Sequence, residues 1–279
     1  MRLLVCTKRD LHGARLLNRL LPSLTGHELV GVWLSDKQRP AEAELPELAE
    51  LACLERHLPV DLLFALVDAL PPALADTAPA ASFHGLARRH GVNLSVFDEL
   101  PDAAARLAAL APDLVIVARF SHLFDAAALA VPRFGLLNLH PGHLPRYAGL
   151  HAPLRSVLEG ETQLACSVHW ITAGIDDGPL VAVHRTPFDP AGGLYTQIGE
   201  LYALALPTVQ AVIAACAAGE RPPGTPQDRR LRRYRSLPGP DDFRAFAARG
   251  LRLWQADAYR AQLAAFLPPG LALPGGLPR

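Results

Sequence analysis

Two polar residues follow an apolar run of the sequence at a spacing that could support chemistry. Asn138 and His140 stand two positions apart in "NLHPGH", directly after the run "FGLL". In an extended segment, residues i and i+2 point to the same face, so both side chains can face one cleft. Pro141 ends strand pairing, and Gly142 permits a tight turn. An amide N–H and an imidazole N–H aimed at one point would stabilise a developing oxyanion.

A carboxylate would be needed to set the protonation state of the histidine. The turn "TAGIDDGPL" offers Asp176 and Asp177 between glycines. A carboxylate beside an imidazole favours the charged ring and orients it. Each residue also has an ordinary structural use, because Asn and Asp form turns and a single His is often a satisfied polar residue. From the spacing alone, both interpretations stay open.

The elements that must position these residues indicate an α/β fold. Residues 2–6 and 27–36 are predicted strands, and the leucine spacing over 13–24 predicts a helix between them. Strands are also expected over 93–97, 113–118, 134–140, 165–171 and 178–187, and helices over 82–91, 101–112, 123–131, 152–160 and 194–219. We therefore expect an open, Rossmann-like, mostly parallel sheet with helices on both faces. Ligands of such sheets bind beyond the carboxyl ends of the strands, where Asn138 and His140 lie.

The chain is predicted to divide into a catalytic domain over 1–205 and a mainly helical C-terminal extension over 206–279. After Gly219 the composition shifts to "ERPPGTPQDRR", which is typical of a linker. One or two helices are expected over 241–267, followed by a loose tail. Residues 37–80 are expected to form helices and loop. Together with the extension, they would shape a substrate site or a homodimer interface.

The bulk composition excludes some classes of protein. Lys plus Arg and Asp plus Glu both number 27 in 279 residues, which argues against a general nucleic-acid binder. The run "DRRLRRYR" is a local exception, and it indicates either a solvated linker or a contact for phosphate. Four well-separated cysteines favour reduced thiols in a cytoplasmic protein. We find no signal peptide, and no window predicts a membrane span, so no membrane partner is expected.

Three linked motifs resemble the signature of the formyltransferase family, whose members act on glycinamide ribonucleotide, methionyl-tRNA or amino sugars. The family pattern is Asn-x-His-Pro, then Leu-Pro-x-x-x-Gly, then an Asp within Gly-(Ile/Leu/Val)-Asp-x-Gly. The matching pieces are "NLHP" from Asn138, "LPRYAG" from Leu144, and "GIDDG" from Gly174. The resemblance covers about residues 1 to 205 and is strongest from 112 to 185. Three motifs in order are more specific than any one of them.

The resemblance implies formyl transfer from 10-formyltetrahydrofolate to an amine. Asn138 and His140 would hold the oxyanion of the tetrahedral intermediate, and His140 as imidazolium could protonate the leaving folate nitrogen. Asp176, which follows Gly-Ile directly, would tune His140 and help remove the amine proton. The pterin pocket of the family uses backbone after the preceding strand and the turn that carries the Asp. By that match, the candidate cofactor-binding residues are His122, Leu123, Phe124, Gly174 and Asp176, with core packing as the alternative for the first three.

The sequence departs from the family pattern at the turn after Pro141. Gly142 stands where the family often has Ser, and His143 replaces a more usual apolar residue. His140 and His143 could suggest a metal pair, but the intervening Pro and Gly disfavour helical presentation and no paired Cys supports it. We therefore expect no metal. His151 is a further candidate for contact with the substrate.

The acceptor amine is harder to predict. The purine-synthesis members carry a Gly- and Ser-rich loop after the first strand, whereas this chain has "CTKRDLHGAR" there. Lys8, Arg9 or Arg15 could bind an anion by side chain, or could be solvated surface. Methionyl-tRNA formyltransferases add a C-terminal β-barrel, whereas the segment after residue 205 looks helical.

We therefore rank a small-molecule amine first, such as an amino sugar nucleotide or a biosynthetic amine or hydroxylamine. Methionyl-tRNA ranks second. A formyltetrahydrofolate hydrolase and a non-catalytic folate-binding protein are further alternatives.

Overall fold

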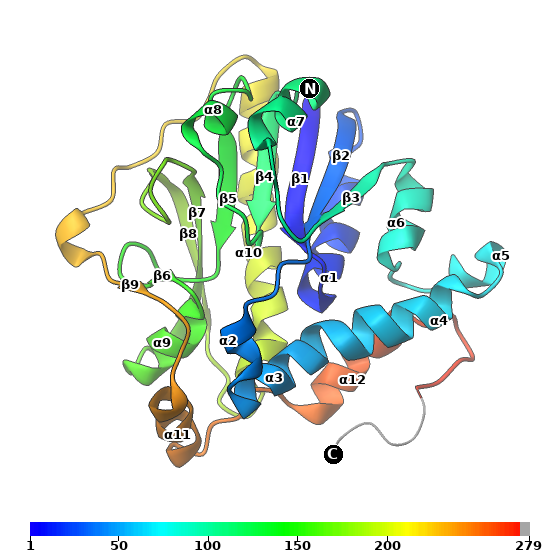
Figure 1. The fold of residues 1–279 in the computed structure, drawn as a ribbon, viewed down its shortest axis with the longest axis vertical. Coiled ribbons are helices and arrows are strands. Elements are labelled where there is room, and N and C mark those ends of the chain that lie inside the picture. The colour runs from blue at the N-terminus through cyan, green and yellow to red at the C-terminus, as the bar shows by residue number, and fades with distance from the viewer. Residues whose placement is uncertain (274–279) are drawn as a thin grey trace.

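The structure, a computed structural model, describes residues 1–273 (Figure 1). Residues 268–273 form no helix or strand. The remainder of the tail that the sequence predicts to be loose lies outside the described residues.

Seven strands form one sheet in the order β3-β2-β1-β4-β5-β7-β8 (Figure 1). The strands are β1 (Arg2–Lys8), β2 (Glu28–Ser35), β3 (Leu94–Phe97), β4 (Leu114–Ala118), β5 (Leu136–His140), β7 (Gln163–Trp170) and β8 (Leu180–Pro187). β3, β2, β1, β4 and β5 pair in parallel, whereas β7 runs antiparallel to both β5 and β8. The mostly parallel sheet predicted from the sequence is confirmed.

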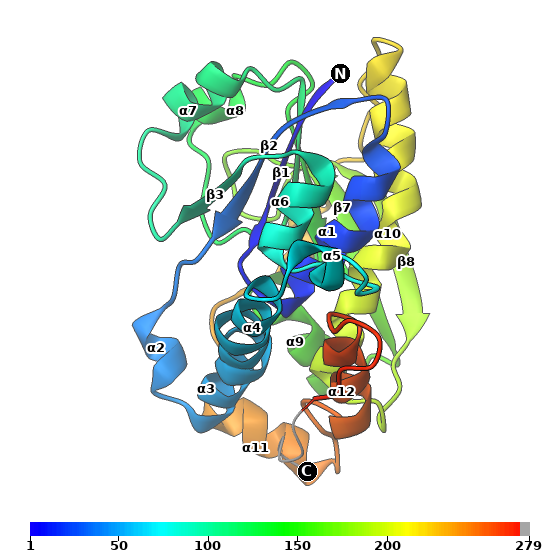
Figure 2. The same ribbon diagram turned by 90° about the vertical axis from the view of Figure 1, so that its right-hand side faces the viewer.

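Helices cover both faces of this sheet, as Figure 2 shows. One face carries α1 (Leu11–Leu20), α6 (Phe83–His90) and α10 (Leu194–Ala217), and the other carries α7 (Ala103–Leu110) and α8 (Ala126–Leu129). The central strand β1 shows why both faces need cover. Leu3 and Val5 pack into the core under α1 and α10, while Leu4 and Cys6 pack into a second core under α7. A strand buried on both faces appears as a continuous apolar run, which is how "RLLVC" stands in the sequence.

Residues 37–80 form the expected helices, which lie across the carboxyl ends of the parallel strands (Figure 1). They are α2 (Pro40–Ala43), α3 (Pro46–Ala52), the π-helical stretch η2 (Cys53–Phe64), α4 (Ala65–Asp68) and α5 (Pro72–Ala75). The segment buries Leu51, Leu54 and Phe64 in the main core. It therefore covers the edge of the sheet where a ligand of this fold class would bind.

The C-terminal extension packs onto the same core. Residue 205 lies inside α10, so the regular structure continues without interruption past the expected domain boundary and ends near the composition shift at Gly219. Beyond it come η3 (Arg229–Leu231), β9 (Tyr234–Arg235), α11 (Pro240–Ala248) and α12 (Ala256–Ala264). Tyr259 is buried and donates its hydroxyl to the carbonyl oxygen of Leu54 at 2.7 Å. The extension thus packs against the helices of residues 37–80 and contacts them through this hydrogen bond.

Two smaller elements complete the chain near the site: β6 (Ala148–Gly149), which pairs in parallel with β9, and α9 (Ala152–Leu158). The 3-10 turn η1 (Leu21–Leu24) closes the first helix.

The long helix α10 is apolar enough to resemble a membrane span. It has 24 residues and a mean hydropathy of 1.5 in its most apolar window, which by length and composition alone would suffice to cross a membrane. The expectation that no window predicts a span is therefore wrong for this segment. The helix packs its buried side, including Ile198, Leu201 and Val209, against β7, β8 and α1. A core helix of a globular domain meets the same length and composition criteria.

Candidate active site

Asn138 lies in β5, opposite a histidine that no sequence motif singled out. β5 pairs with β7 so that Asn138 stands across from His169. The Nδ2 of Asn138 lies 3.0 Å from Nε2 of His169, while Nδ1 of His169 lies 3.0 Å from the carbonyl oxygen of Trp170. The carbonyl requires a hydrogen on Nδ1, so in the neutral ring Nε2 accepts from the Asn138 amide. Burial lowers the pKa of His169 to about 4 although Asp176 opposes the shift, and this neutral ring leaves the second amide hydrogen of Asn138 for a reactant.

His140 is the last residue of β5 and is buried. Its Nε2 lies 2.7 Å from the carbonyl oxygen of Tyr147, and its Nδ1 lies 3.5 Å from Oδ1 of Asp176. Both neighbours are acceptors, so a ring that carries hydrogen on both nitrogens fits both of them. The distance between Nδ1 and Oδ1 of Asp176 is longer than a normal hydrogen bond, so the hydrogen on Nδ1 is still available to a reactant.

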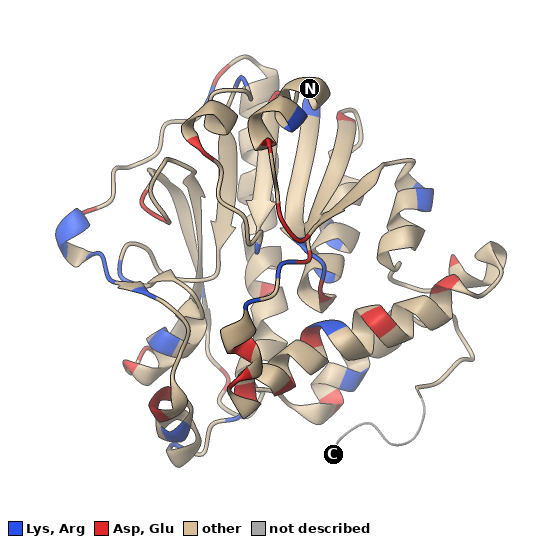
Figure 3. Cartoon of the chain, viewed as in Figure 1, with Lys and Arg blue, Asp and Glu red and all other residues tan. Residues whose placement is uncertain are grey.

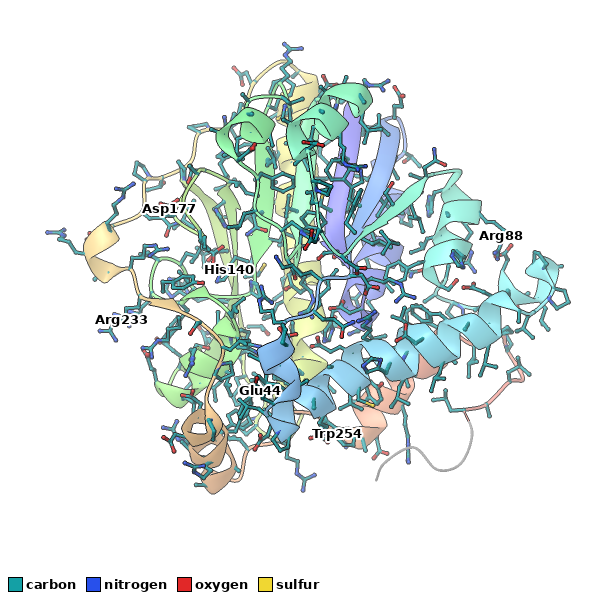
Figure 4. The ribbon with its side chains drawn as sticks, in the orientation of Figure 1. Glu44, Arg88, His140, Asp177, Arg233 and Trp254 are labelled. Carbon is teal, nitrogen blue, oxygen red and sulfur yellow. The ribbon has the colours of Figure 1, made fainter. Side chains whose placement is uncertain are left out.

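The structure also distinguishes the two adjacent aspartates. Oδ2 of Asp176 accepts the backbone N–H of Gly149 at 2.8 Å, and its Oδ1 faces His140. Asp177 instead accepts the hydroxyl of Thr172 within its own turn. Figure 4 shows His140 at the end of β5 and Asp177 in the turn that also carries Asp176. The geometry therefore brings Asp176, and not Asp177, to the histidine.

Gly142 explains one departure from the family pattern. A Cβ at this position would lie 2.7 Å from Nε2 of His140 and 2.8 Å from the carbonyl oxygen of Tyr147. Any larger residue would thus push against the two atoms that form the His140 hydrogen bond. The buried Ser167 holds the same turn, because its hydroxyl donates to the carbonyl oxygen of Gly142 at 2.6 Å and accepts the N–H of Leu144 at 3.1 Å.

The other two histidines of the motif point elsewhere. Nε2 of His143 lies 2.8 Å from a guanidinium nitrogen of Arg185, and burial together with that cation lowers the pKa of His143. His151 caps α9 and contacts the hydroxyl of Tyr195, and burial lowers the pKa of His151 to about 4. Within residues 1–273, no group of three or more His, Cys, Asp or Glu residues is arranged to hold a metal.

The candidate folate segment follows β4, which ends beside β5 because Ala118 pairs with Leu139. His122 and Phe124 are buried, and Nε2 of His122 lies 3.2 Å from the carbonyl oxygen of Phe97. Leu123 between them is 74% exposed. Gly174, the other candidate, lies against the Asp177 carboxylate, where a Cβ would come within 2.1 Å of an oxygen. The buried pair anchors the loop, and Leu123 remains available at its tip.

A second polar group, which we call the ion-pair cluster, lies at the carboxyl ends of β1 and β4. Its members are Asp10, His12, Glu55 and Arg119. Arg119 donates to Asp10 at 2.5 and 3.0 Å and to Glu55 at 2.7 Å, and His12 Nε2 lies 3.5 Å from Glu55. The cluster ties the segment 37–80 to the sheet beside the candidate site.

The arginines in and after the charged loop that follows β1 form ion pairs with carboxylates elsewhere in the chain. Arg9 lies 3.0 Å from Asp61 and 3.5 Å from Asp36, and Arg15 lies 2.6 Å from Glu200. These two arginines thus bind carboxylates of the chain rather than lying open as an anion site.

Together, the open parallel sheet, the amide and imidazole groups at the end of β5 and the adjacent carboxylate form an α/β fold with a polar candidate site at the carboxyl edge of the sheet. Residues 91–200, which contain Asn138, His140 and Asp176, match the family described as formyl transferase. This part of the chain belongs to the formyltransferase family.

Relatives show how far the similarity extends. Methionyl-tRNA formyltransferase from Pseudomonas paraeruginosa is 31% identical over 201 residues, covering 70% of this chain and 53% of the relative. The chain spans from 32% to 53% of the length of the leading curated relatives.

Among solved structures, glycinamide ribonucleotide transformylase 1 from Symbiobacterium toebii superposes with a TM-score of 0.55 at 21% identity, covering 82% of this chain and 94% of that one. A sugar 3N-formyl transferase solved with dTDP and 5-N-formyl-THF gives a TM-score of 0.54 at 14% identity, covering 85% and 69%. These structures establish the fold.

Proposed function

We propose that the chain transfers a formyl group from 10-formyltetrahydrofolate to an amine, with Asn138, His140 and Asp176 at the reacting atoms. The observation that carries the proposal is the position of Asp176 Oδ1, which lies 3.5 Å from His140 Nδ1 and 3.7 Å from His169 Nε2, the ring atom that lies 3.0 Å from the amide nitrogen of Asn138. Two donors and one acceptor meet there at the carboxyl end of a central strand. That combination suits a reaction in which an oxyanion forms and a proton must be moved.

The donor supplies a formyl carbon whose bond to nitrogen breaks as the amine nitrogen bonds to it. The free amide hydrogen of Asn138 and a hydrogen on His140 would stabilise the negative oxygen. Oδ2 of Asp176 is occupied by the N–H of Gly149, whereas the ring nitrogens that face Oδ1 stand 3.5 and 3.7 Å away, beyond a normal hydrogen bond. Oδ1 is therefore the acceptor we assign to the amine proton. His140 carries the proton that the leaving nitrogen takes up.

The loop after β4 fits a folate ring. Within residues 1–273, no backbone-to-backbone hydrogen bond involves residues 120–124 outside regular elements. Their N–H and C=O groups are thus free of backbone partners and suit the donor and acceptor edge of a pterin. The exposed Leu123 could cover one face of such a ring, while Phe124 and His122 keep the loop in place.

Two classes of acceptor have support. The similarity to methionyl-tRNA formyltransferases favours methionyl-tRNA more strongly than the sequence-based ranking did. Within residues 218–273 the C-terminal extension forms two α-helices, α11 and α12, that pack on the catalytic domain, and a small amine remains the second class of acceptor. We propose methionyl-tRNA as the first acceptor to test and an amino sugar nucleotide or another biosynthetic amine as the second.

Release of tetrahydrofolate from 10-formyltetrahydrofolate tests the proposal. The purified chain is incubated with methionyl-tRNA, with amino sugar nucleotides and with simple amines, and each product is checked for the formyl group by mass spectrometry. We expect release that depends on one acceptor class and disappears in His140→Ala. Release without any acceptor would instead indicate a hydrolase. Folate binding without release would indicate a non-catalytic folate-binding protein.

A further inference from the structure

A segment of the C-terminal extension crosses the back of the candidate site. Residues 222–235, which we call the strap, connect the end of α10 with α11. Near its start, the carbonyl oxygen of Pro222 accepts the indole N–H of Trp170 at 3.0 Å. Thr225 then exchanges two backbone hydrogen bonds of 2.7 and 2.8 Å with Leu180. The strap is thereby fixed to the last residue of β7 and the first residue of β8, on either side of the turn that carries Asp176.

The middle of the strap holds the backbone of that turn. The side-chain amide of Gln227 donates to the carbonyl oxygens of Asp176 at 3.1 Å and of Gly178 at 2.7 Å. The guanidinium of Arg232 donates to the carbonyl oxygen of Ile175 at 2.7 Å. Three carbonyls in a stretch of four residues thus have strap side chains as their donors.

The end of the strap holds the residue that binds the carboxylate. β9 in the strap pairs with β6, so that Gly149 stands beside Arg235. Gly149 has φ +94°, and a Cβ there would lie 2.1 Å from the carbonyl oxygen of Arg235, so only glycine permits this approach. The same Gly149 donates its N–H to Oδ2 of Asp176 at 2.8 Å. The strap therefore acts on both the turn that carries Asp176 and the donor that orients its carboxylate.

Asp176 depends on such support because its backbone is not in a relaxed conformation. Its φ is +51°, in the left-handed region that residues other than glycine rarely adopt. A residue held there costs free energy and persists only where its surroundings determine it. If the strap donors were removed, the turn could relax and Oδ1 would move away from His140.

We propose that Gln227 and Arg232 are positioning residues that keep Asp176 against His140, so that the extension completes the catalytic geometry. The inference rests on the proposed function of Asp176. It also gives a role to the run "DRRLRRYR", for which the sequence suggested only a solvated linker or a phosphate contact. Arg232 points inward to the turn, while Arg235 pairs with Glu159 and Arg230 pairs with Asp228 of the strap itself. Figure 3 shows the basic outer side of this run at η3, and Figure 4 labels Arg233 within it.

The test uses side chains that keep their length but lose their donors. Gln227→Met and Arg232→Met should each lower kcat about tenfold, which corresponds to about 1.4 kcal/mol of transition-state stabilisation. The two losses together should lower kcat of the double variant about a hundredfold. Arg232→Lys keeps a hydrogen-bond donor and should therefore retain most of the wild-type kcat. Arg230→Met is the matched control on the same strap and should leave kcat unchanged, because Arg230 makes its ion pair with Asp228.

A second measurement does not depend on turnover. The ring resonances of His140, observed by NMR in histidine-labelled protein, should move in Gln227→Met and Arg232→Met. Amide exchange over residues 174–178 should become faster in the same variants. Neither quantity should change in Arg230→Met.

The outcomes separate this inference from the proposed function. If the wild-type chain forms no formylated product but the two variants still move the His140 resonances, the reaction is wrong and the positioning role stands. If the wild-type chain is active and both variants keep its kcat and its His140 resonances, the positioning role is wrong. If Gln227→Met does not fold, the comparison of Arg232→Met with Arg232→Lys decides between the same two outcomes.

Discussion

Two polar clusters lie at the carboxyl edge of the same sheet and contain similar residues, yet they are built differently. The cluster that we propose to be catalytic, here named the catalytic cluster, consists of Asn138, His140 and Asp176 with the adjacent His169. The ion-pair cluster consists of Asp10, His12, Glu55 and Arg119. In the catalytic cluster, Asp176 Oδ1 lies 3.5 and 3.7 Å from the two histidine rings. In the ion-pair cluster, Arg119 lies 2.5 to 3.0 Å from its carboxylates.

The difference shows how the same residue types acquire different roles. The mostly buried guanidinium of Arg119 is bound by two carboxylates, so its removal would leave those carboxylates without their cation and destabilise the fold. A carboxylate with one oxygen free of close donors, as in Asp176, can accept a proton, and we propose that this is its role. We therefore expect substitutions in the catalytic cluster to lower turnover with little change in stability. Substitutions in the ion-pair cluster should instead lower the stability of the fold with little change in turnover.

The largest expected effect is on turnover in the catalytic cluster. Asn138→Ala, His140→Ala and Asp176→Asn should each lower kcat by about 10²- to 10³-fold, as expected when a group that stabilises the developing charge or moves the proton is lost. The measurement is tetrahydrofolate release with the acceptor found to work. Asp177→Asn is the matched control, because Asp177 contacts Thr172 and not the histidine, and it should keep kcat within about tenfold. Equal losses at both aspartates would contradict the assignment of Asp176.

The ion-pair cluster should show its effect in the free energy of unfolding. Arg119→Met leaves the buried Asp10 and the mostly buried Glu55 without their cation, which should lower the free energy of unfolding by about 3–5 kcal/mol. Denaturant unfolding measures it, and Arg244→Met, which removes an exposed pair with Asp241, should cost under about 1 kcal/mol. A large loss of kcat in folded Arg119→Met with normal stability would erase the distinction between the clusters.

The same variant carries a pH dependence. Burial acts to raise the pKa of Glu55, but Arg119 and then His12 outweigh it and hold that pKa below its usual range. A carboxyl with a depressed pKa stabilises the fold above its unfolded pKa, and that stabilisation is lost as the pH falls. The difference in stability between wild type and Arg119→Met should therefore narrow below about pH 4.

The sequence predicted the parts of the molecule that depend on short-range patterns. The sheet, its helices and the partnership of Asn138 with His140 follow from alternation, helical spacing and a separation of two residues within one strand. His169 was missed because it joins the site through the antiparallel pairing of β5 with β7, which gives no sign in the local sequence. A search for polar residues on the strand preceding the Asp176 turn would have found it.

The ion-pair cluster and the strap could not be predicted for the same physical reason. Glu55 and Arg119 belong to elements 64 positions apart, and Gln227 contacts Asp176 across 51 positions. Such contacts depend on how finished elements pack, which no local pattern encodes. Residue 205 likewise marks no break in regular structure, because α10 continues to Ala217.

Gly142 allows a test of how closely the position of the His140 ring controls turnover. Gly142→Ala would place its Cβ 2.7 Å from Nε2 of His140 and displace the ring from the Tyr147 carbonyl. We expect kcat to fall about tenfold or more, since misplacement of a reacting group by a fraction of an ångström is costly. Gly31→Ala in β2 is the control, because its nearest contacts would be ordinary ones at 3.5 to 3.8 Å. Unchanged kcat in Gly142→Ala would mean that the exact place of the ring matters little.

The smallest expected effect tests the one place where the catalytic cluster also bears on stability. Burial lowers the pKa of His169 to about 4, so between that value and the unfolded pKa of about 6.5 the unfolded chain binds more protons than the folded one. This group therefore stabilises the fold fully above about pH 6.5, and its contribution declines as the pH falls toward 4. His169→Gln keeps an acceptor for the Asn138 amide and does not titrate, so it should flatten the slope of unfolding free energy against pH in that window. An unchanged slope would mean that His169 is charged beside Asp176, and Asn138 would then need a different orientation to reach the oxyanion.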